Sequence, residues 1–404
     1  TIFTGDNLPI MRGMNSESVD LIYLDPPFNS NANYAAPIGS KAAGAEFKDT
    51  WTLDDVDNAW LDLIETKYPA LNRVIHAAMT NSDKSYLIYM AARLLEMKRI
   101  LKDTGSIYLH CDPTMSHYLK LVMDAVFRKK NFKREVTWSN EDTSGFKSKA
   151  NNWIRVGEIL LYYTKSEKYT FNKQYHSLDE KTIKRYDKID ENGKRFKIYK
   201  NKDGSERRSY LKKDRGASIG SVWTDIPSFQ KVNNTGENTG YPTQKPLALL
   251  DRIIKASSNE GDLVLDPFCG CATTLVAADR LQRDWIGIDL SGKAAELVVE
   301  RIKADQGLFE EIITRTDIPK RTDLGDIPRY NAPQNRTRLY GEQEGYCNGC
   351  GEHFQMQNLE VDHIIAETSG GTDHIDNLQL LCGHCNRVKG DRGQEYLVSR
   401  INKD

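Results

Sequence analysis

Two short apolar runs that each end on Asp-Pro constrain the fold of this chain more than any other feature. The first is "VDLIYLDPPF" at residues 19–28, and the second is "LVLDPFCG" at residues 263–270. Apolar runs of this length that stop at a proline are typical of buried strands in a parallel sheet. Because ligands bind beyond the carboxyl ends of such strands, we expect both Asp-Pro corners to lie at the functional edge of the sheet.

Helical periodicity alternates with further apolar runs along the chain. Apolar residues at helical spacing between positions 87 and 101 predict a helix that Gly105 ends, followed by a strand at residues 107–109. Further helices are predicted at "HYLKLVMDAVF", "PLALLDRIIKASS" and "ATTLVAADRL", and further strands at "EILLYYTK" and "DWIGIDLS". This alternation predicts an α/β fold with a mainly parallel sheet.

The length of 404 residues suits two or three domains. We predict one domain at residues 1–312 and a small separate module at residues 339–404. Residues 313–338 contain three prolines, many charges and no period, which predicts a linker. No apolar run is long enough to cross a bilayer and no secretory leader opens the sequence, so we expect a cytoplasmic protein.

Residues 165–235 break the α/β alternation and carry a local positive charge. The whole chain has a formal net charge of −1, but residues 165–215 contain 17 Lys and Arg against 9 Asp and Glu, with seven Tyr and Phe side chains interleaved. This combination suits a phosphate backbone and exposed bases. A solvated charged insert without a nucleic-acid partner is the alternative.

The second Asp-Pro corner predicts a cofactor that contains a nucleoside. In "VLDPFCGCATT" a strand leads through a turn of small residues into a helix, so a ligand can approach the backbone and the electropositive helix N-terminus. About 20 residues further on, a strand ends on Asp289, and an acid at this spacing can accept hydrogen bonds from ribose hydroxyls. The turn lacks GxGxxG, which disfavours a dinucleotide.

The first corner carries groups that suit methylation of an exocyclic amine on a base. The lone pair of such an amine is delocalised into the ring, so two hydrogen-bond acceptors are needed to localise it toward a methyl donor. Asp25 offers a side-chain acceptor, and the rigid Pro26-Pro27 pair offers a fixed carbonyl. Phe28 offers a flat face on which a base that has left the duplex can stack. A plain strand-ending turn is the alternative.

The order of these motifs resembles the amino-methylating DNA methyltransferases of the permuted (beta) order, which have a Rossmann-like fold and bind S-adenosylmethionine. The resemblance is carried by "DPPF", "YPTQKP", "VLDPFCG" and "GIDLS", and it covers about residues 1–305 outside the charged insert. It implies that Asp25, Pro26, Pro27 and Phe28 form the catalytic motif and that residues 165–235 recognise the target. It implies that the cofactor site comprises Asp6, Thr243, Lys245, Pro246, Asp266, Phe268, Gly270 and Asp289.

The resemblance also implies a substrate. An Asp at the first motif position accompanies mainly adenine in this order, so adenine N6 is favoured over cytosine N4. The expected partner is double-stranded DNA whose target base is flipped out, which would associate the protein with the nucleoid. Relatives of this order are often dimers, so a homodimer stays open. Ala272 departs from the family, which usually has a second glycine at this position.

Four of the seven cysteines form two CxxC pairs near the C-terminus. They are Cys347, Cys350, Cys382 and Cys385. Four thiolates suit a tetrahedral structural zinc ion, whereas disulfides are rare in chains that are not secreted. A module of this size also needs such a staple to fold.

The segments "VDHI", "DNLQLLC" and "CNRVKG" resemble the HNH (ββα-metal) endonucleases. The resemblance implies that His363 activates water as the general base and that Asn377 braces the loop that orients it. It implies that Asp362 and Asn386 hold a divalent cation such as magnesium. Basic residues expected to contact phosphates are Arg387, Lys389 and Arg392.

Together these observations predict a bifunctional DNA-modifying enzyme of the restriction–modification type. One rival is a methyltransferase, possibly for cytosine N4, whose zinc module only binds DNA. Another is a nuclease whose methyltransferase fold only senses the target. Methylation of RNA or protein is disfavoured by the nuclease module.

Overall fold

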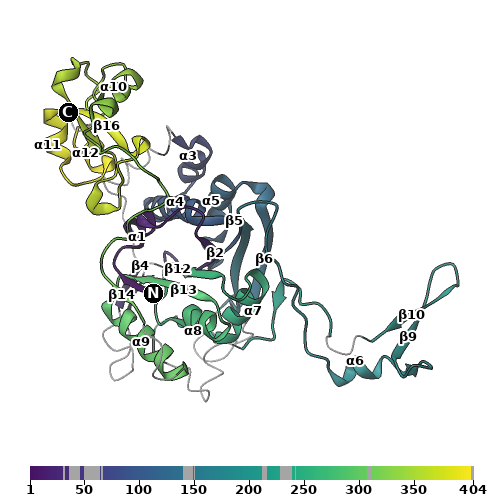
Figure 1. Ribbon diagram of the computed structural model, residues 1–404. Helices are drawn as coiled ribbons and strands as arrows, with labels where there is room; N and C mark the ends of the chain where they lie inside the picture. Colours follow the sequence, from purple (N-terminus) through teal and green to yellow (C-terminus); the bar gives the residue numbers. More distant parts are fainter. Residues whose placement is uncertain are drawn as a thin grey trace.

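The computed structural model describes residues 1–30, 32–35, 46–49, 64, 67–139, 149, 151–211, 216–227, 239–241, 243–306 and 312–401. Figure 1 shows three parts, which we call the body, the arm and the module. The body is built around a large sheet and contains the N-terminus. The arm, residues 180–210, projects from one side of the body, and the module, residues 333–401, carries the C-terminus.

A nine-stranded sheet forms the centre of the body in the described residues. Its strands are β1 (Ile2–Thr4), β2 (Val19–Leu24), β5 (Leu101–Cys111), β6 (Phe132–Ser139), β7 (Gly157–Thr164), β11 (Val222–Trp223), β12 (Leu263–Asp266), β13 (Asp284–Asp289) and β14 (Thr314–Arg315). Their order is β11-β6-β7-β5-β2-β12-β13-β1-β14. Neighbours pair in parallel except β7, which is antiparallel to β5 and β6. The predicted α/β fold with a mainly parallel sheet is confirmed.

Helices cover both faces of this sheet. One apolar cluster contains residues of α1 (Asn7–Gly13), α3 (Pro69–His76), α4 (Asn81–Ile100) and α5 (Ser116–Phe127). A second contains residues of α7 (Leu247–Ser257), α8 (Thr273–Arg280) and α9 (Gly292–Gln306). Strand residues alternate between the faces, so Ile22 and Leu24 of β2 join the first cluster while Leu21 and Tyr23 join the second. Burial on both faces explains why β2 is apolar at nearly every position.

The end of α4 differs from the prediction. The helix ends at Ile100, and β5 begins directly at Leu101, so Gly105 lies inside the strand. The register between β5 and β2 shifts here, because residues 102–105 form an irregularity in the ladder. A Cβ atom at Gly105 would lie only 2.6 Å from Cδ1 of Leu101. The glycine therefore marks a close approach within the strand and not the helix end that the sequence predicted.

The arm contains regular structure that the sequence pattern did not predict. It comprises α6 (Glu180–Lys184), β8 (Lys188–Ile189), β9 (Arg195–Lys200) and β10 (Glu206–Tyr210), with the strands in the antiparallel order β10-β9-β8. Phe196 is buried in this small sheet beside Tyr210, and most of its other side chains are charged and exposed. The three short strands of the arm bury too few side chains to leave a period-2 pattern in the sequence. The body contains a further antiparallel pair, β3 (Ala32–Ala35) and β4 (Glu46–Asp49).

The module is a β-hairpin packed against helices. Its elements are α10 (Pro333–Glu342), β15 (Leu359–His363), β16 (Leu378–Cys382), α11 (Gly383–Lys389) and α12 (Gln394–Ile401). Strands β15 and β16 are antiparallel, and their apolar side chains share one small cluster with Leu339 and Leu397. Helix α10 therefore packs with the module although it begins at Pro333, inside the segment that the sequence predicted to be a linker.

The segment between body and module is tied to the C-terminal end of α1. A Cβ atom at Gly13 would lie 2.0 Å from the carbonyl oxygen of Pro319, so the chain passes directly over this glycine. The backbone N–H of Ser16 donates to Asp323 at 3.0 Å. Asn15 and Thr322 exchange two hydrogen bonds of 2.8 Å each. Polar side chains thus order a segment whose composition predicted only a linker.

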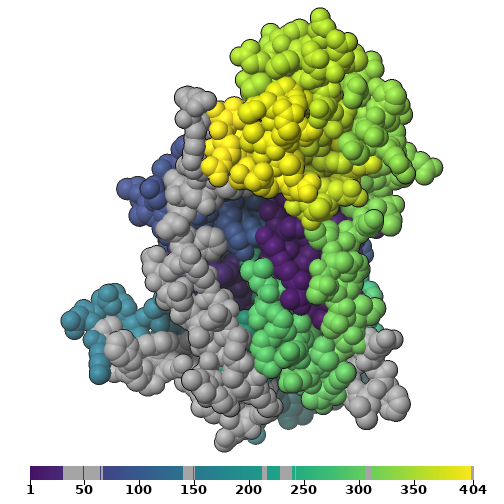
Figure 2. Space-filling model, turned by 90° about the vertical axis from the view of Figure 1, so that its left-hand side faces the viewer, coloured from purple at the N-terminus to yellow at the C-terminus, as the bar shows by residue number. Residues whose placement is uncertain are grey.

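The module also contacts α1 directly. A Cβ atom at Gly370 would lie 2.5 Å from the carbonyl oxygen of Pro9, which shows how closely the two backbones approach. Figure 2 shows the module above a hollow in the surface, with N-terminal residues, coloured purple, exposed in that hollow. Within the described part of the chain, no helix is both long and apolar enough to span a membrane.

Candidate active sites

The carboxyl ends of four neighbouring parallel strands bring together the acids that the sequence singled out. Asp25 directly follows β2, and Asp266 and Asp289 are the last residues of β12 and β13. Asp6 follows β1 by two positions. Because β2, β12, β13 and β1 are consecutive in the sheet, these carboxylates line one edge. This arrangement joins the two Asp-Pro corners, although they lie far apart in the sequence.

The loop that carries the "DPPF" residues is held by a residue that the sequence analysis missed. Asp49, at the end of β4, is almost fully buried and accepts hydrogen bonds from the backbone N–H groups of Phe28, Asn29 and Ser30 at 3.2, 2.7 and 2.8 Å. Asn29 adopts a left-handed conformation with φ of 57°. The loop is thereby fixed by one carboxylate, and no sequence signal near Asp49 pointed to this role.

Asp25 forms an ion pair with Lys245. The Nζ atom of Lys245 lies 3.0 Å from Oδ2 of Asp25 and 3.3 Å from Oε2 of Glu158. Lys245 is almost fully buried, and it lies 5.3 Å from the ring centroid of Phe28. The resemblance implied that Lys245 belongs to the cofactor pocket, and the structure also places its ammonium against Asp25 of the "DPPF" loop.

His110 completes this group of side chains. It is fully buried at the end of β5, and Nδ1 lies 2.8 Å from the hydroxyl of Tyr23 while Nε2 lies 2.7 Å from Oε2 of Glu158. Burial raises the pKa of Tyr23 well above its usual value, so its hydroxyl stays protonated and shares this hydrogen bond with Nδ1. The ring of His110 also lies 6.1 Å from that of Phe28. The sequence analysis did not identify Glu158.

Asp266 shapes the turn after β12. One of its oxygens accepts from the backbone N–H of Phe268 at 3.0 Å, and the other accepts from the hydroxyl of Thr274 at 2.5 Å. Only 3% of the residue is exposed, and this burial raises its pKa to about 7. The Asp266 carboxylate therefore orders the turn from its buried side. A ligand on the exposed side of the turn would contact the backbone that Asp266 holds.

The turn requires a glycine at position 270 because the backbone conformation there is left-handed and a neighbouring side chain leaves little room for a Cβ atom. Gly270 has φ of 47°, and a Cβ atom there would lie 3.0 Å from the ring of Tyr241. Its N–H donates to Oδ2 of Asp289 at 2.9 Å, and Oδ1 of Asp289 accepts from Ser291 at 2.9 Å. Burial raises the pKa of Asp289. Ala272 also adopts the left-handed region, with φ of 70°, at the N-cap of α8.

The remaining residues of the predicted cofactor site flank this turn. Asp6 accepts from Arg93 at 2.7 Å and is half exposed. The side chain of Asn7 donates to the carbonyl of Pro267 at 2.7 Å, which ties β1 to the turn after β12. Thr243 has φ of 64°, and Pro246 is the N-cap residue of α7. These positions surround the same sheet edge, so the part of the site that the structure describes is continuous.

The four cysteines of the module converge. The sulfur atoms of Cys347, Cys350, Cys382 and Cys385 all lie within 4.8 Å of one another. The backbone N–H groups of Gly349 and Cys382 point at the sulfur of Cys347 at 3.4 and 3.2 Å, which favours its thiolate. Four sulfurs at this spacing fit the donor set of a tetrahedral zinc ion. Cys111, Cys269 and Cys271 lie apart from this cluster, buried in the body.

His363 lies at the end of β15, held by two polar neighbours. Its Nε2 lies 2.8 Å from Oδ1 of Asp373, and its ring lies 4.7 Å from that of Tyr330. Asn377 accepts from the N–H of Ile365 at 2.9 Å and donates to two carbonyls of the same loop at 3.0 and 2.9 Å. The expected bracing of the loop after His363 by Asn377 matches these contacts. Asp373 and Tyr330 were not identified from the sequence.

Asp362 lies on β15 and Asn386 on α11, and each has a polar partner. Lys389 is fully buried, with Nζ 3.1 Å from Asp362, and Asn386 donates to Glu360 at 2.5 Å. Glu360 and Asp362 share one face of β15, and Asn386 and Lys389 share one face of α11. Three oxygen-bearing side chains thus lie in one layer, a donor set that suits magnesium. Lys389 was expected to contact phosphates, and its burial excludes that role in this conformation.

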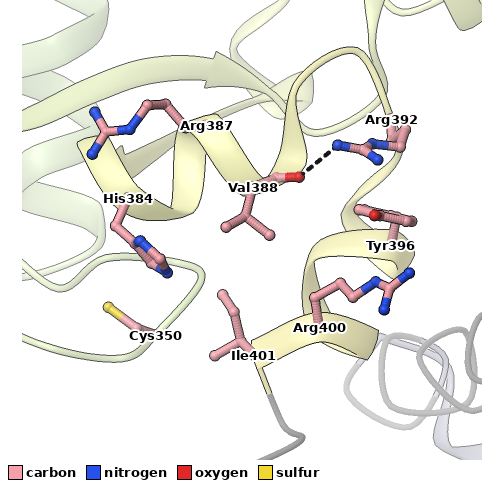
Figure 3. A pocket seen from close by; sticks show the side chains of 8 residues that line it. All are labelled: Cys350, His384, Arg387, Val388, Arg392, Tyr396, Arg400 and Ile401. Atoms are coloured by element: carbon pink, nitrogen blue, oxygen red, sulfur yellow. Dashed lines mark hydrogen bonds between the residues drawn. The ribbon is translucent and has the colours of Figure 1, made fainter.

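Arginine side chains gather on the opposite side of α11. A pocket of about 610 Å³ is lined by Cys350, His384, Arg387, Val388, Arg392, Tyr396, Arg400 and Ile401. Figure 3 shows that these side chains come mainly from α11 and α12, and that Arg392 donates to the carbonyl of Val388. The guanidinium carbon of Arg392 lies 3.8 Å from the centroid of the Tyr396 ring. The pocket contains no acidic residue, so it suits an anion.

Comparisons with known proteins agree with both sites. Residues 19–300 match the DNA methylase family, and residues 347–392 match the HNH endonuclease family. Type II methyltransferase M.EcaI of Enterobacter cloacae is 29% identical over 393 residues, covering 85% of this chain and 78% of the relative. DNA adenine methyltransferase YhdJ of Escherichia coli (strain K12) is 28% identical over 333 residues, covering 81% of this chain and 92% of the relative.

Solved structures also align with most of the chain. The crystal structure of the M1.HpyAVI–SAM complex aligns with a TM-score of 0.41 at 16% identity, covering 75% of this chain and 98% of that one. The PvuII DNA methyltransferase (cytosine-N4-specific) aligns with a TM-score of 0.43 at 13% identity, covering 78% of this chain and 94% of that one.

Proposed function

Because this chain belongs to the DNA methylase family over residues 19–300, we propose that it methylates adenine N6 at a specific site in duplex DNA and that its HNH module cleaves or nicks DNA. The observation that supports this most strongly is the sheet edge on which the "DPPF" loop and the glycine turn meet on the adjacent strands β2 and β12. A restriction–modification system is the setting in which both activities serve one purpose.

In the proposed reaction, Asp25 and a carbonyl of the Pro26-Pro27 pair accept the two N–H bonds of the amino group. This localises the nitrogen lone pair toward the methyl donor, and Phe28 stacks on the flipped base. Asp49 holds the loop so that these groups keep their relative positions before substrate arrives. The chain thus acts mainly by orienting and polarising the amine.

S-adenosylmethionine, when bound, supplies the electrophilic methyl group. The residues proposed to hold it flank the turn after β12, with Gly270 giving access to the backbone and Asp289 and Asp6 offering acceptors for ribose and adenine. Asp266 would act indirectly, since both of its oxygens bond within the turn. The fit of this site rests on its buried carboxylates and on the cradle at Gly270 that a Cβ atom would fill.

Adenine is the proposed base. Asp at the first position of the motif favours it, and one relative that matches 81% of this chain is named a DNA adenine methyltransferase. Cytosine N4 is the competing base, because the same family contains enzymes of both kinds. Base composition analysis of methylated DNA distinguishes the two directly.

In the module, His363 is proposed to activate a water molecule, and its contact with Asp373 orients the ring for this task. Asp362 and Asn386, with Glu360 beside them, would hold a divalent cation such as magnesium, which stabilises charge on the leaving oxygen. Cys347, Cys350, Cys382 and Cys385 would hold a structural zinc ion.

One experiment tests both activities. The purified chain is incubated with plasmid DNA, S-adenosylmethionine and Mg²⁺, and modified bases and strand breaks are mapped by single-molecule sequencing. Asp25→Ala should lower methylation by about 100-fold or more and leave breaks unchanged, and His363→Ala should do the reverse. Exposed residues serve as controls in Asp103→Ala and His117→Ala. Methylation that survives Asp25→Ala would refute the assigned centre.

A second candidate function is favoured by the arginine pocket of Figure 3, namely that the module only binds DNA. Replacing Arg387, Arg392 and Arg400 together by Ala should then weaken DNA binding and reduce its dependence on salt concentration. If no divalent cation supports strand breaks with the unmodified chain, while this variant loses DNA affinity, the module is a DNA-binding element. Breaks that require His363 exclude that reading.

A further inference from the structure

Glu158 is a partly buried carboxylate, with 27% of its side chain exposed, at the methyltransferase site, and the proposed chemistry does not use it. It is the second residue of β7, and β7 is antiparallel to β5. The N-terminal end of β7 therefore meets the carboxyl ends of the parallel strands. This topology places an acid at the same edge of the sheet as Asp25. The acid lies at the beginning of its strand, so no motif at the end of a strand reveals it in the sequence.

Glu158 contacts both side chains that surround Asp25. Its Oε2 lies 3.3 Å from the ammonium of Lys245 and 2.7 Å from Nε2 of His110. Nδ1 of His110 lies 2.8 Å from the hydroxyl of Tyr23, so the imidazole lies between Tyr23 and Glu158. Burial would raise the pKa of Glu158, but Lys245 and His110 hold it well below its usual range.

Lys245 is shared between two carboxylates. Burial would lower its pKa, but Asp25 and Glu158 raise it above its usual value. The two carboxylates of Asp25 and Glu158 and the one ammonium of Lys245 together carry a net charge of −1. Without Glu158, Lys245 would neutralise Asp25, and the group beneath the amine would carry no net charge.

The charge matters at the moment of methyl transfer. A bond forms between the amino nitrogen and the methyl carbon while the carbon–sulfur bond breaks toward sulfur. The nitrogen then carries a positive charge until one of its protons passes to solvent. A buried group with a net negative charge stabilises this state more than the neutral amine.

We propose that Glu158 is a positioning residue for methyl transfer, which shares Lys245 with Asp25 so that Asp25 stays a strong acceptor in a group of net negative charge. The inference rests on the proposed function of Asp25. Glu158 does not touch the substrate in this account and acts through Lys245 and His110.

The test is the Glu158→Gln variant, which keeps the shape and removes the charge. We expect its single-turnover rate of methyl transfer to fall about tenfold to a hundredfold, as Coulomb's law gives for one charge several ångströms from the reacting atom. The dissociation constants for S-adenosylmethionine and DNA should stay within about twofold, because the effect is confined to the transition state. Glu158→Asp should recover most of the rate, and Glu135→Gln, on an exposed position of the neighbouring strand β6, serves as the control.

The pH dependence gives a readout that a merely structural role would not move. Removing a negative charge eases ionisation of the remaining carboxylate, so the acid limb of the pH–rate profile should move to lower pH in Glu158→Gln and return in Glu158→Asp. Other titratable groups near Asp25 are Tyr23, His110, Cys111, Tyr241, Lys245 and Asp266. They are present in every variant, so the comparison isolates Glu158.

Each outcome decides between specific accounts. A normal rate and profile in Glu158→Gln, with Asp25→Ala inactive, would overturn the inference and leave the proposed function intact. A lower rate with equal loss of cofactor and DNA binding and of thermal stability would also overturn it, because Glu158 would then be structural. If the unmodified chain transfers no methyl group to DNA, the proposed function itself fails, and the inference fails with it.

Discussion

The body and the module keep their folds by different means. The body buries two large apolar clusters, one on each face of its sheet. The module has one small cluster of ten buried residues, and three of these are cysteines of the CxxC pairs. A core of that size cannot offset the conformational entropy of the chain without a further staple. The comparison teaches that the two proposed activities would depend on separable sources of stability, namely apolar area in the body and the proposed zinc site in the module.

The largest expected effect follows from the metal. Cys382→Ser, or a strong zinc chelator, should unfold the module, because structural zinc contributes on the order of 10 kcal/mol to such folds. Hydrogen exchange of peptides from β15 and β16 should become fast, while peptides from β2 and β12 keep their protection. Zinc content should fall in Cys382→Ser and stay constant in Cys111→Ser, which alters a buried cysteine of the body. An unchanged zinc content in Cys382→Ser would remove the basis of the comparison.

An effect of intermediate size is expected on the pH dependence of the stability of the body, and not of the module. Burial raises the pKa of Asp266 to about 7, above its value in the unfolded chain, so the folded state binds the extra proton between these two values. Its contribution to stability is present at low pH and is lost as pH rises toward 7. We expect the free energy of unfolding of the body, without cofactor, to fall by about 1 kcal/mol per pH unit between pH 5 and 7 from this group.

Urea unfolding at pH 5.5 and 7.5, followed by hydrogen exchange of the β12 peptide, measures this dependence. Asp266→Asn removes the titration and keeps an acceptor for the N–H of Phe268. The variant should therefore show a flatter dependence on pH than the unmodified chain. Equal slopes in both proteins would mean that Asp266 ionises as readily in the folded body as in water.

The smallest effect is expected at Ala272. Changing this residue to Gly relieves a left-handed conformation that costs about 1–2 kcal/mol for a residue with a Cβ atom. It also loses the burial of one methyl group, about 0.8 kcal/mol, and adds about 0.5–1 kcal/mol of backbone entropy. These contributions nearly cancel, so Ala272→Gly should change the free energy of unfolding by less than about 1 kcal/mol.

Ala277→Gly is the matched control for this prediction. Ala277 is equally buried but lies inside α8 with helical geometry, so its change to Gly should cost about 1.5–2 kcal/mol with no strain to relieve. Thermal unfolding of both variants provides the measurement. Equal losses in the two variants would show that Ala272 is not strained.

The sequence predicted the strands β2, β5, β7, β12 and β13, which are buried on both faces, but it did not predict β1, β6, β11 or β14. A run such as residues 21–24 is recognisable without knowledge of its partners. The end of α4 was predicted wrongly, since Gly105 marks a close approach within β5, and a glycine alone does not distinguish such a site from a helix cap. The short strands of the arm bury too little to leave a pattern.

The site residues that the sequence analysis missed share one property. Asp49, Glu158 and Asp373 each act on a motif residue from another segment of the chain, across a pairing that no local pattern encodes. Lys245 was singled out from its motif, but its ion pair with Asp25 was not predicted, because the motif does not give the direction of the side chain. Motifs thus predicted which residues meet at the site, and three-dimensional topology was needed to see what holds them.

The hydrogen bonds that tie residues 322 and 323 to the end of α1, which we call the clamp, limit how far the module can move from the body. Asp323 is fixed to Ser16, and α10 begins at Pro333, so only residues 324–332 lie between the clamp and the module. Fully extended, they span at most about 30 Å. If the module left α1, it would remain near the body at an effective concentration in the millimolar range. Cleavage by the module would then be confined to DNA within a fixed radius of the body. Once DNA is bound, the rate of cleavage would not depend on the concentration of the enzyme.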